Sequence, residues 1–250
     1  MMPRALAISP HLDDAAFSCG GTLARLARMG WAVTVCTAFT QSVPRPTGFA
    51  LDCQLDKGLG PEVDYMALRR AEDAAACALL GAAPQWLDLP EAPHRGYGDA
   101  RALFAPPRPA DGIAAPLTRA LISMLDAGPD LVLAPQAVGG HVDHVVLVRA
   151  LSAVLPTDLP VLWWTDFPYS AKPQSHPARP FAAEMAAWPD VAVEGDAETR
   201  HRACSAYGTQ LGFQFGGEAG LRQALAEAGA VERFRAQGRA LLPSGLRAAA

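Results

Sequence analysis

The sequence predicts a single-domain α/β fold in which helices cover both faces of a mostly parallel, Rossmann-like sheet. Short β-type runs alternate with longer helical patterns, an order typical of parallel sheets. The 250 residues suffice for one full core, and half of them are hydrophobic while 18% are charged, which is a globular profile. We expect one domain over residues 1–250, with a core at about 4–210 and a C-terminal region, about 211–250, that the pattern leaves undefined.

The first strand and helix follow directly from the N-terminal sequence. The apolar run at Ala5–Ser9 predicts a strand, and apolar residues at helical spacing predict a helix over Asp13–Met29. Gly30 ends this helix, and the β-branched run at Ala32–Phe39 predicts the second strand.

The middle of the chain continues the alternation. A second helix is predicted over Tyr65–Leu80 and is closed by Gly81, a residue that commonly ends helices. The apolar segment Trp86–Leu89 predicts the third strand, and Ile113–Asp126 has the spacing of a third helix.

The remaining elements begin after a Gly-Pro break at residues 128–129. Leu131–Ala134 and Val161–Asp166 are predicted as the fourth and fifth strands, with a helix over Val145–Leu155 between them. Ala197–Gln210 and Ala219–Ala228 have helical patterns.

Three long loops rich in Pro or Gly follow predicted strands, at Gln41–Asp64, Pro90–Gly112 and Pro168–Pro180. Ligands of open α/β sheets bind beyond the carboxyl ends of the strands. We therefore expect the three loops to surround one pocket, although plain surface insertions are the alternative for each loop.

Charge and composition exclude several classes of protein. A net charge of −4 argues against broad binding of nucleic acid or anionic membranes, which needs clustered Lys and Arg. No apolar run reaches the roughly 20 residues of a membrane-spanning helix, and the N-terminal apolar stretch is too short for a secretory signal. We expect a cytoplasmic protein, with a homo-oligomer left open. The five scattered cysteines predict neither a disulfide framework nor a cysteine zinc site.

Two motifs carry His and Asp to the same edge of the predicted sheet. SPHLDD (9–14) ends the first strand, and GGHVDH (139–144) follows the fourth. Imidazole and carboxylate groups bind zinc and similar divalent ions, and such an ion activates water and polarises a carbonyl. A spare carboxylate can then accept a proton and a spare histidine can donate one. Helix capping by the acids is the alternative for either motif alone, but their convergence favours a metal-dependent hydrolase.

With these motifs the sequence resembles the LmbE-like, or PIG-L, family of metal-dependent de-N-acetylases. The similarity rests on SPHLDDAAFSCGG (9–21), on RRAED (69–73) followed by LLG, on GGHVDH (139–144) and, more weakly, on SAYGTQ (205–210). The resemblance implies one divalent metal held by His11, Asp14 and His144. Zinc is favoured, with iron or another divalent ion as the alternative.

The same resemblance implies roles for neighbouring residues. Asp13 would be the general base, and His141 the general acid or the group that stabilises the oxyanion. Asp143 would orient His141 as an outer partner. Arg69 is a candidate for substrate contact, and its alternative is a helix-surface network with the acids at 72 and 73.

One position departs from the family pattern. Some members place an oxyanion-stabilising tyrosine two residues before the first histidine of the second motif, where this chain has Gly139. Tyr97, Tyr169 or Tyr207 could replace it from a loop, or the histidine could act alone.

The function expected from the resemblance is hydrolytic removal of an N-acyl group, expected to be N-acetyl, from a small amino-sugar-containing substrate. The first motif has Ala15 where the common form has Glu, which points weakly to the branch that acts on secondary-metabolite sugars. The alternatives are an amidase of a thiol or sugar conjugate and a non-catalytic carbohydrate-binding relative. A nucleotide-binding protein is disfavoured because the first turn lacks Gly-x-Gly-x-x-Gly.

Overall fold

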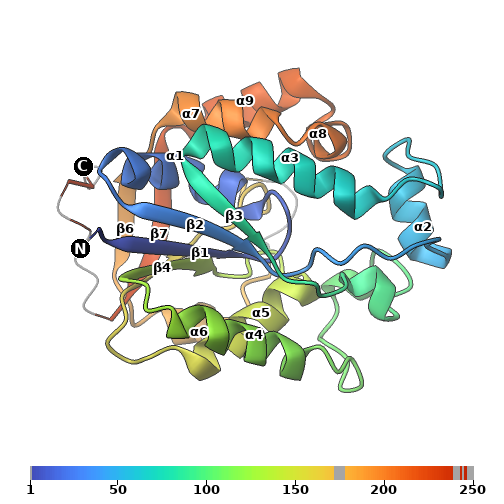
Figure 1. Cartoon of the computed structure of the whole chain (residues 1–250), viewed down its shortest axis with the longest axis horizontal. Coiled ribbons are helices and arrows are strands. Elements are labelled where there is room, and N and C mark those ends of the chain that lie inside the picture. The colour runs from blue at the N-terminus through green and yellow to red at the C-terminus, as the bar shows by residue number, and fades with distance from the viewer. Residues whose placement is uncertain (1, 172–177, 239–242, 244, 247–250) are drawn as a thin grey trace.

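A seven-stranded sheet forms the centre of the molecule in the computed structural model, which describes residues 2–171, 178–238, 243 and 245–246 (Figure 1). Its order is β3-β2-β1-β4-β5-β7-β6. The first five strands are parallel, whereas β7 is antiparallel to β5 and to β6. The prediction of a mostly parallel sheet is confirmed. The strands are β1 (Arg4–Ser9), β2 (Ala32–Thr37), β3 (Ala82–Trp86), β4 (Leu131–Pro135), β5 (Val161–Trp164), β6 (Asp190–Glu194) and β7 (Val231–Gln237).

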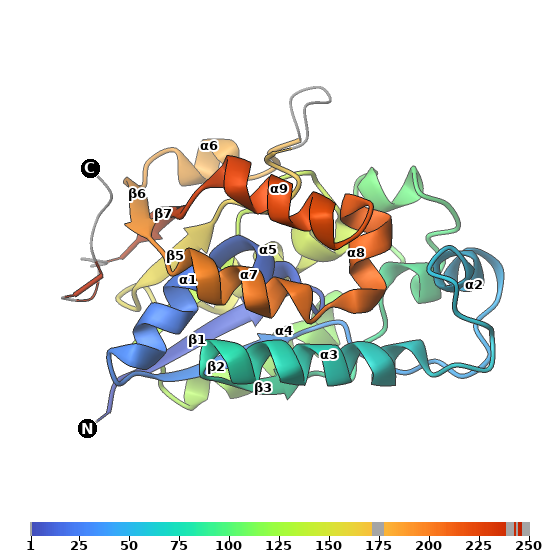
Figure 2. The same ribbon diagram turned by 90° about the horizontal axis from the view of Figure 1, so that it is seen from above.

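Helices cover both faces of this sheet, as predicted. One layer contains α1, α3, α7 and α9, and the opposite layer contains α4, α5 and α6 (Figures 1 and 2). A separate apolar core lies under each layer, and the two cores share the sheet. The helices are α1 (Asp14–Arg28), α2 (Gly48–Leu55), α3 (Tyr65–Leu80), α4 (Ala114–Asp126), α5 (Val142–Val154), α6 (Ala182–Met185), α7 (Ala197–Ser205), α8 (Gly208–Phe215) and α9 (Glu218–Ala228), with 3₁₀ turns η1 (Ala92–Arg95) and η2 (Ala102–Phe104).

The third strand lies earlier than its predicted position at Trp86–Leu89. Gly81 ends α3 in the left-handed conformation (φ 71°), and the chain enters β3 at the next residue. Strand β3 lies at the edge of the sheet and is half exposed, so its sequence lacks the apolar run from which a buried strand is predicted. The apolar residues Leu87 and Leu89 pack instead against the core on the α4–α5 side.

Several boundaries in the second half also differ from the prediction. The helix expected from residue 145 begins at Val142, so the second histidine of GGHVDH lies inside its first turn. The helix predicted over 197–210 is two helices, α7 and α8, separated near Tyr207. The first long loop contains α2, and β6 and β7 were not predicted at all.

The C-terminal region is part of the sheet. Strand β7 lies between β5 and β6, and its alternate residues Glu232, Phe234 and Ala236 are buried. This pairing supports treatment of the chain as one domain. No helix in the described part of the chain has the length and apolar character that a bilayer crossing requires.

Helix α1 is interrupted at Cys19, where the backbone leaves the helical region (φ −143°, ψ 20°). The buried Glu232 carboxylate accepts the backbone N–H of Gly21, just after the break, at 2.9 Å and that of the next residue at 2.7 Å. On the other side of the break, Arg200 Nε donates to the Phe17 carbonyl at 2.9 Å. Two side chains from the C-terminal part of the sequence therefore form hydrogen bonds with backbone groups on the two sides of the break.

Candidate active site

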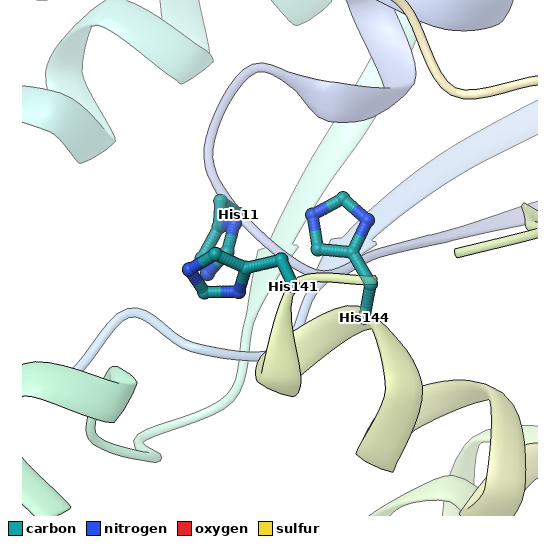
Figure 3. Close-up of side chains that lie close together, drawn as sticks. All are labelled: His11, His141 and His144. Carbon is teal, nitrogen blue, oxygen red and sulfur yellow. The ribbon is translucent and has the colours of Figure 1, made fainter. Parts of the chain in front are cut away.

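The two His/Asp motifs meet at the carboxyl edge of the parallel strands. His11 lies in the turn after β1, and Asp13 and Asp14 begin α1. His141 is the N-cap residue of α5 and His144 lies in the first turn of that helix. The three histidine rings converge from the β1 turn and the start of α5 (Figure 3).

The three predicted metal ligands are in contact. The Asp14 Oδ2 atom is 3.3 Å from His11 Nδ1 and 3.2 Å from His144 Nε2. The His144 ring is fully buried, and its Nε2 makes no well-formed hydrogen bond to any described residue. A buried polar atom without such a partner is costly, and a cation between these atoms would satisfy it.

Each of the two histidines predicted as ligands contacts a buried carboxylate on the side away from Asp14. The His11 Nε2 atom is 3.0 Å from Asp143 Oδ2, and the His144 Nδ1 atom is 3.0 Å from Asp166 Oδ1. Such outer carboxylates fix the ring and its tautomer in metal sites. The nitrogen that remains on each ring is the one that faces Asp14.

Asp143 therefore has a different partner from the one expected. We predicted that it orients His141, but its carboxylate contacts His11. Its Oδ1 atom is 2.8 Å from Arg95 Nη2, and its Oδ2 atom also accepts the backbone N–H of Ala92 at 3.1 Å. These contacts hold the carboxylate on the side of His11, and only the backbone N–H of Asp143 reaches His141.

A second grouping of donors is formed by the histidines alone, since ring nitrogens of His11, His141 and His144 lie within 4.8 Å of one another. In His141, however, Nδ1 accepts the backbone N–H of Asp143 at 3.2 Å, so a neutral ring carries its proton on Nε2. Burial and the charge of His11 lower the pKa of His141 to about 3. His141 is thus arranged as a neutral donor, and the set with Asp14 fits a cation better.

The predicted ligands Asp14 and His144 shift each other's pKa values. Burial alone would raise the pKa of Asp14, but the charge of His144 and the contacts with His11 hold it well below its usual value. Burial would lower the pKa of His144, yet Asp14 and Asp166 raise it to about 9. The carboxylates thus favour positive charge at this point, which a divalent ion supplies more fully than a proton.

Asp13 is separate from the ligand contacts, as a general base would be. Burial raises the pKa of Asp13 to about 7, although Arg69 opposes the shift. The Asp13 Oδ2 atom accepts a hydrogen bond from Gln214 Nε2 at 3.1 Å and is 3.5 Å from Arg69 Nη2. A carboxylate with a pKa near neutrality is suited to accept and return a proton.

Arg69 is buried beside Asp13 and lines the pocket. It donates to Glu91 Oε1 at 2.8 Å and to the Leu12 carbonyl at 2.9 Å. These contacts make it a positioning group for Asp13 and the turn before it, and substrate contact stays a prediction.

The alternative surface network for Arg69 is wrong. Glu72 instead contacts the backbone and hydroxyl of Thr209, and Asp73 accepts from Trp86 and Tyr207. The acids of the RRAED segment therefore connect α3 to β3 and to the start of α8, while Arg69 of the same segment supports the site.

One of the three tyrosines considered as a replacement at Gly139 lies in the site. Tyr97 and Tyr207 are buried and donate to Asp111 and Asp73 elsewhere. Tyr169 lines the pocket, with its ring centroid 5.7 Å from that of His144. A Cβ at Gly139 (φ 100°) would lie 2.7 Å from the Tyr169 ring. The space that a side chain at 139 would need is thus taken by Tyr169.

Four residues of the site were not singled out in the sequence: Glu91, Arg95, Asp166 and Gln214. Asp166 had a usable signal, because it ends the predicted fifth strand at the same edge as both motifs. Glu91 and Arg95 lie in a loop without regular pattern, and Gln214 belongs to a region left undefined.

The pocket above these residues has a volume of about 280 Å³. All three long loops line it, as predicted, through residues such as Phe49, Phe104 and Tyr169. Residues 172–177 of the third loop lie outside the described residues. Helix α8 also contributes, through Gln210, Phe213 and Gln214.

Comparisons with known proteins identify the family. Residues 6–155 match the PIG-L family, described as GlcNAc-PI de-N-acetylase. A 2'-N-acetylparomamine deacetylase from Streptomyces fradiae is 35% identical over 213 residues, which cover 83% of this chain and 73% of that protein.

Two solved structures share the fold along nearly the whole chain. The zinc-inhibited form of a teicoplanin deacetylase has a TM-score of 0.78 at 26% identity, covering 96% of this chain and 100% of its own. An A40926 pseudoaglycone deacetylase has a TM-score of 0.77 at 30% identity, covering 97% and 100%.

Proposed function

The chain belongs to the PIG-L family of de-N-acetylases, and from this premise we propose that it hydrolyses the N-acetyl group of an amino-sugar-containing small molecule. The observation that carries the proposal is the ligand arrangement. Two histidines, each held by a buried carboxylate, direct their other nitrogen to Asp14.

We assign the metal to His11, Asp14 and His144. Two nitrogens and one carboxylate oxygen fit a catalytic zinc ion, which keeps a further position open for reactants. Iron and other divalent ions accept the same donors, and zinc is our choice. When bound, the ion supplies Lewis acidity toward an acyl carbonyl and toward water.

The protein groups account for the proton transfers and the charge. Asp13 accepts a proton from the attacking water and passes it to the departing amine, so that water and amide give acetate and a free amino sugar. Arg69 and Gln214 hold the Asp13 carboxylate in place for both transfers. His141 donates its Nε2–H to the oxygen that becomes negative on attack.

Tyr169 serves as the second donor to this oxygen. Its position against Gly139 supports the assignment, since the ring fills the space where a tyrosine at 139 would lie. Burial and the nearby Asp14 raise the pKa of Tyr169, so the hydroxyl keeps its proton. The role of the missing residue is thus supplied from a different loop.

The test combines acetate release with metal content. The purified protein is supplied with zinc, iron(II) or cobalt(II) and incubated with a panel of N-acetylglucosaminides while released acetate is measured. Acetate should form only with metal present. His11→Ala, Asp14→Ala and His144→Ala should each lower bound metal, whereas His201→Ala, which changes a histidine of α7 outside the site, should not. Full metal content in all three site variants would refute the ligand assignment.

The two alternatives give different results in the same test. A non-catalytic carbohydrate-binding relative would bind the sugars and release no acetate with any metal. An amidase of a thiol or sugar conjugate would release an acid other than acetate from such conjugates and leave simple N-acetylglucosaminides intact.

A further inference from the structure

An aromatic rim surrounds the opening of the active-site pocket. Phe49 of α2, Phe104 of η2 and Phe213 of α8 line the pocket from three separate elements. Phe213 is 67% exposed and Phe104 is 49% exposed. The phenylalanines outside this rim pack instead against the two apolar cores. Apolar groups gathered at a pocket indicate a ligand contact more often than chance exposure does.

The size of the pocket explains what such a rim would contact. The pocket volume of about 280 Å³ is slightly smaller than the roughly 300–1,000 Å³ of most small-molecule sites. The inner part is polar, with His11, Asp13 and His141. A sugar ring with its acetamido group belongs there, so whatever the sugar is attached to must meet the rim.

The acids of the pocket have protein partners and leave little for a cationic ligand. Glu91 contacts Arg69 at 2.8 Å, and Arg69 also lies 3.5 Å from Asp13. Asp143 contacts Arg95 and His11. These carboxylates are neutralised within the protein, so they are poor receptors for the ammonium groups of a polycationic ligand.

The rim itself has balanced charge. It holds one exposed acid, Asp56, and next to it Lys57. The Lys57 ammonium donates to the Cys53 carbonyl at 2.7 Å and lies 4.8 Å from the centroid of the Phe213 ring. This cation–π contact stabilises the position of Phe213 at the opening. The positive charge of Lys57 also balances the negative charge of Asp56.

We propose that the rim binds an aromatic aglycone, and that the substrate is an N-acetyl amino sugar linked to an aromatic carrier. The identity of the substrate rests on the proposed function, whereas the binding of an aromatic group by the rim does not depend on it. The carrier stacks on Phe104 and Phe213 while the sugar enters the polar part of the pocket. A polycationic aminoglycoside is disfavoured, because its remaining ammonium groups would face this rim.

The first experiment compares kcat/KM for acetate release with four substrates: the two anomers of 4-nitrophenyl N-acetylglucosaminide, free N-acetylglucosamine and 2'-N-acetylparomamine. We expect the aryl glycoside to be preferred, chiefly through a lower KM. In the Phe104→Ala/Phe213→Ala double variant this preference should fall roughly 10-fold, as expected for two lost aromatic contacts. The control Ile122→Ala removes an exposed apolar side chain of α4, away from the pocket, and should keep the preference.

A second experiment tests the rim without turnover. Calorimetric titration of the metal-free protein should give tighter binding of the aryl glycoside than of free N-acetylglucosamine, with the difference lost in the double variant. Equal affinity for both sugars, or preferred deacetylation of 2'-N-acetylparomamine, would overturn the inference while leaving the deacetylase proposal intact. Absence of acetate from every substrate would refute the deacetylase proposal, and the titration would still decide the rim.

Discussion

Asp166→Asn tests whether the carboxylate behind His144 prepares the ring for a metal. Asp166 Oδ2 accepts the backbone N–H groups of Gln136 at 3.1 Å and Val138 at 2.9 Å, and Oδ1 faces His144 Nδ1. In the variant, the amide oxygen must stay with the two backbone donors, so the NH₂ group faces Nδ1. That arrangement favours the tautomer with the proton on Nε2, the atom that faces Asp14.

Metal binding must then displace this proton or break the new hydrogen bond. Loss of an outer partner costs about 10- to 100-fold in metal affinity, or about 1.4 to 2.8 kcal/mol of binding free energy. We expect this weakening in a zinc titration against a chromophoric chelator. The melting temperature of the metal-free protein should also fall, because the buried His144, whose pKa Asp14 and Asp166 raise to about 9, loses one of its two acidic partners. Asp190→Asn, on the exposed edge strand β6, is the matched control. Parental zinc affinity in Asp166→Asn would refute the reasoning.

Three further predictions address other parts of the molecule. Asp13→Asn should keep its metal, measured by elemental analysis, and lose roughly 100- to 10,000-fold in kcat, the usual contribution of a general base; loss of the metal would make Asp13 a ligand. Tyr169→Phe should lower kcat by roughly 10- to 1,000-fold with little change in KM, as for a lost oxyanion donor, and a parental kcat would leave His141 as the main donor. Asp196→Ala should lower the free energy of unfolding by about 1 kcal/mol through the lost N-cap of α7. Thr199 and Arg28 outweigh burial and lower the pKa of Asp196 to about 2, from an unfolded value of 3.8. The difference in urea denaturation should therefore be full above pH 4 and fade toward pH 2, and a difference that grows on acidification would contradict this sign.

The proximity of the three residues of the proposed metal site could be predicted because their signal is local. His11 and Asp14 lie within one short motif at the end of an apolar strand, and His144 lies in a second motif of the same kind. The carboxyl ends of parallel strands meet at one edge, so the topology alone brings the two motifs together. The same rule could have indicated Asp166, which lies two residues after the end of β5.

Other parts of the site depend on contacts that no local pattern encodes. Gln214 reaches Asp13 across 201 positions of the sequence, from a helix that follows an unpredicted break. The histidine partner of Asp143 could not be predicted, because the Asp143 carboxylate is held by Arg95, which lies in a loop without a regular sequence pattern. Strand β7 alternates charged and apolar residues, but it carries the buried Glu232 at an inward position, so its burial could not be read from polarity.

The hydrogen bonds from the backbone after the α1 break to Glu232 have a consequence for the order of folding during synthesis. Gly21 and Glu232 are 211 positions apart, which a ribosome covers in roughly 10 to 40 s. Until then the N–H groups after the break have no carboxylate, and the helix that begins with Asp14 lacks its final support. The strands β1, β2 and β4 are synthesised before β7, so α1, which begins beside the proposed metal site, can acquire its complete set of hydrogen bonds only after β7 has been made.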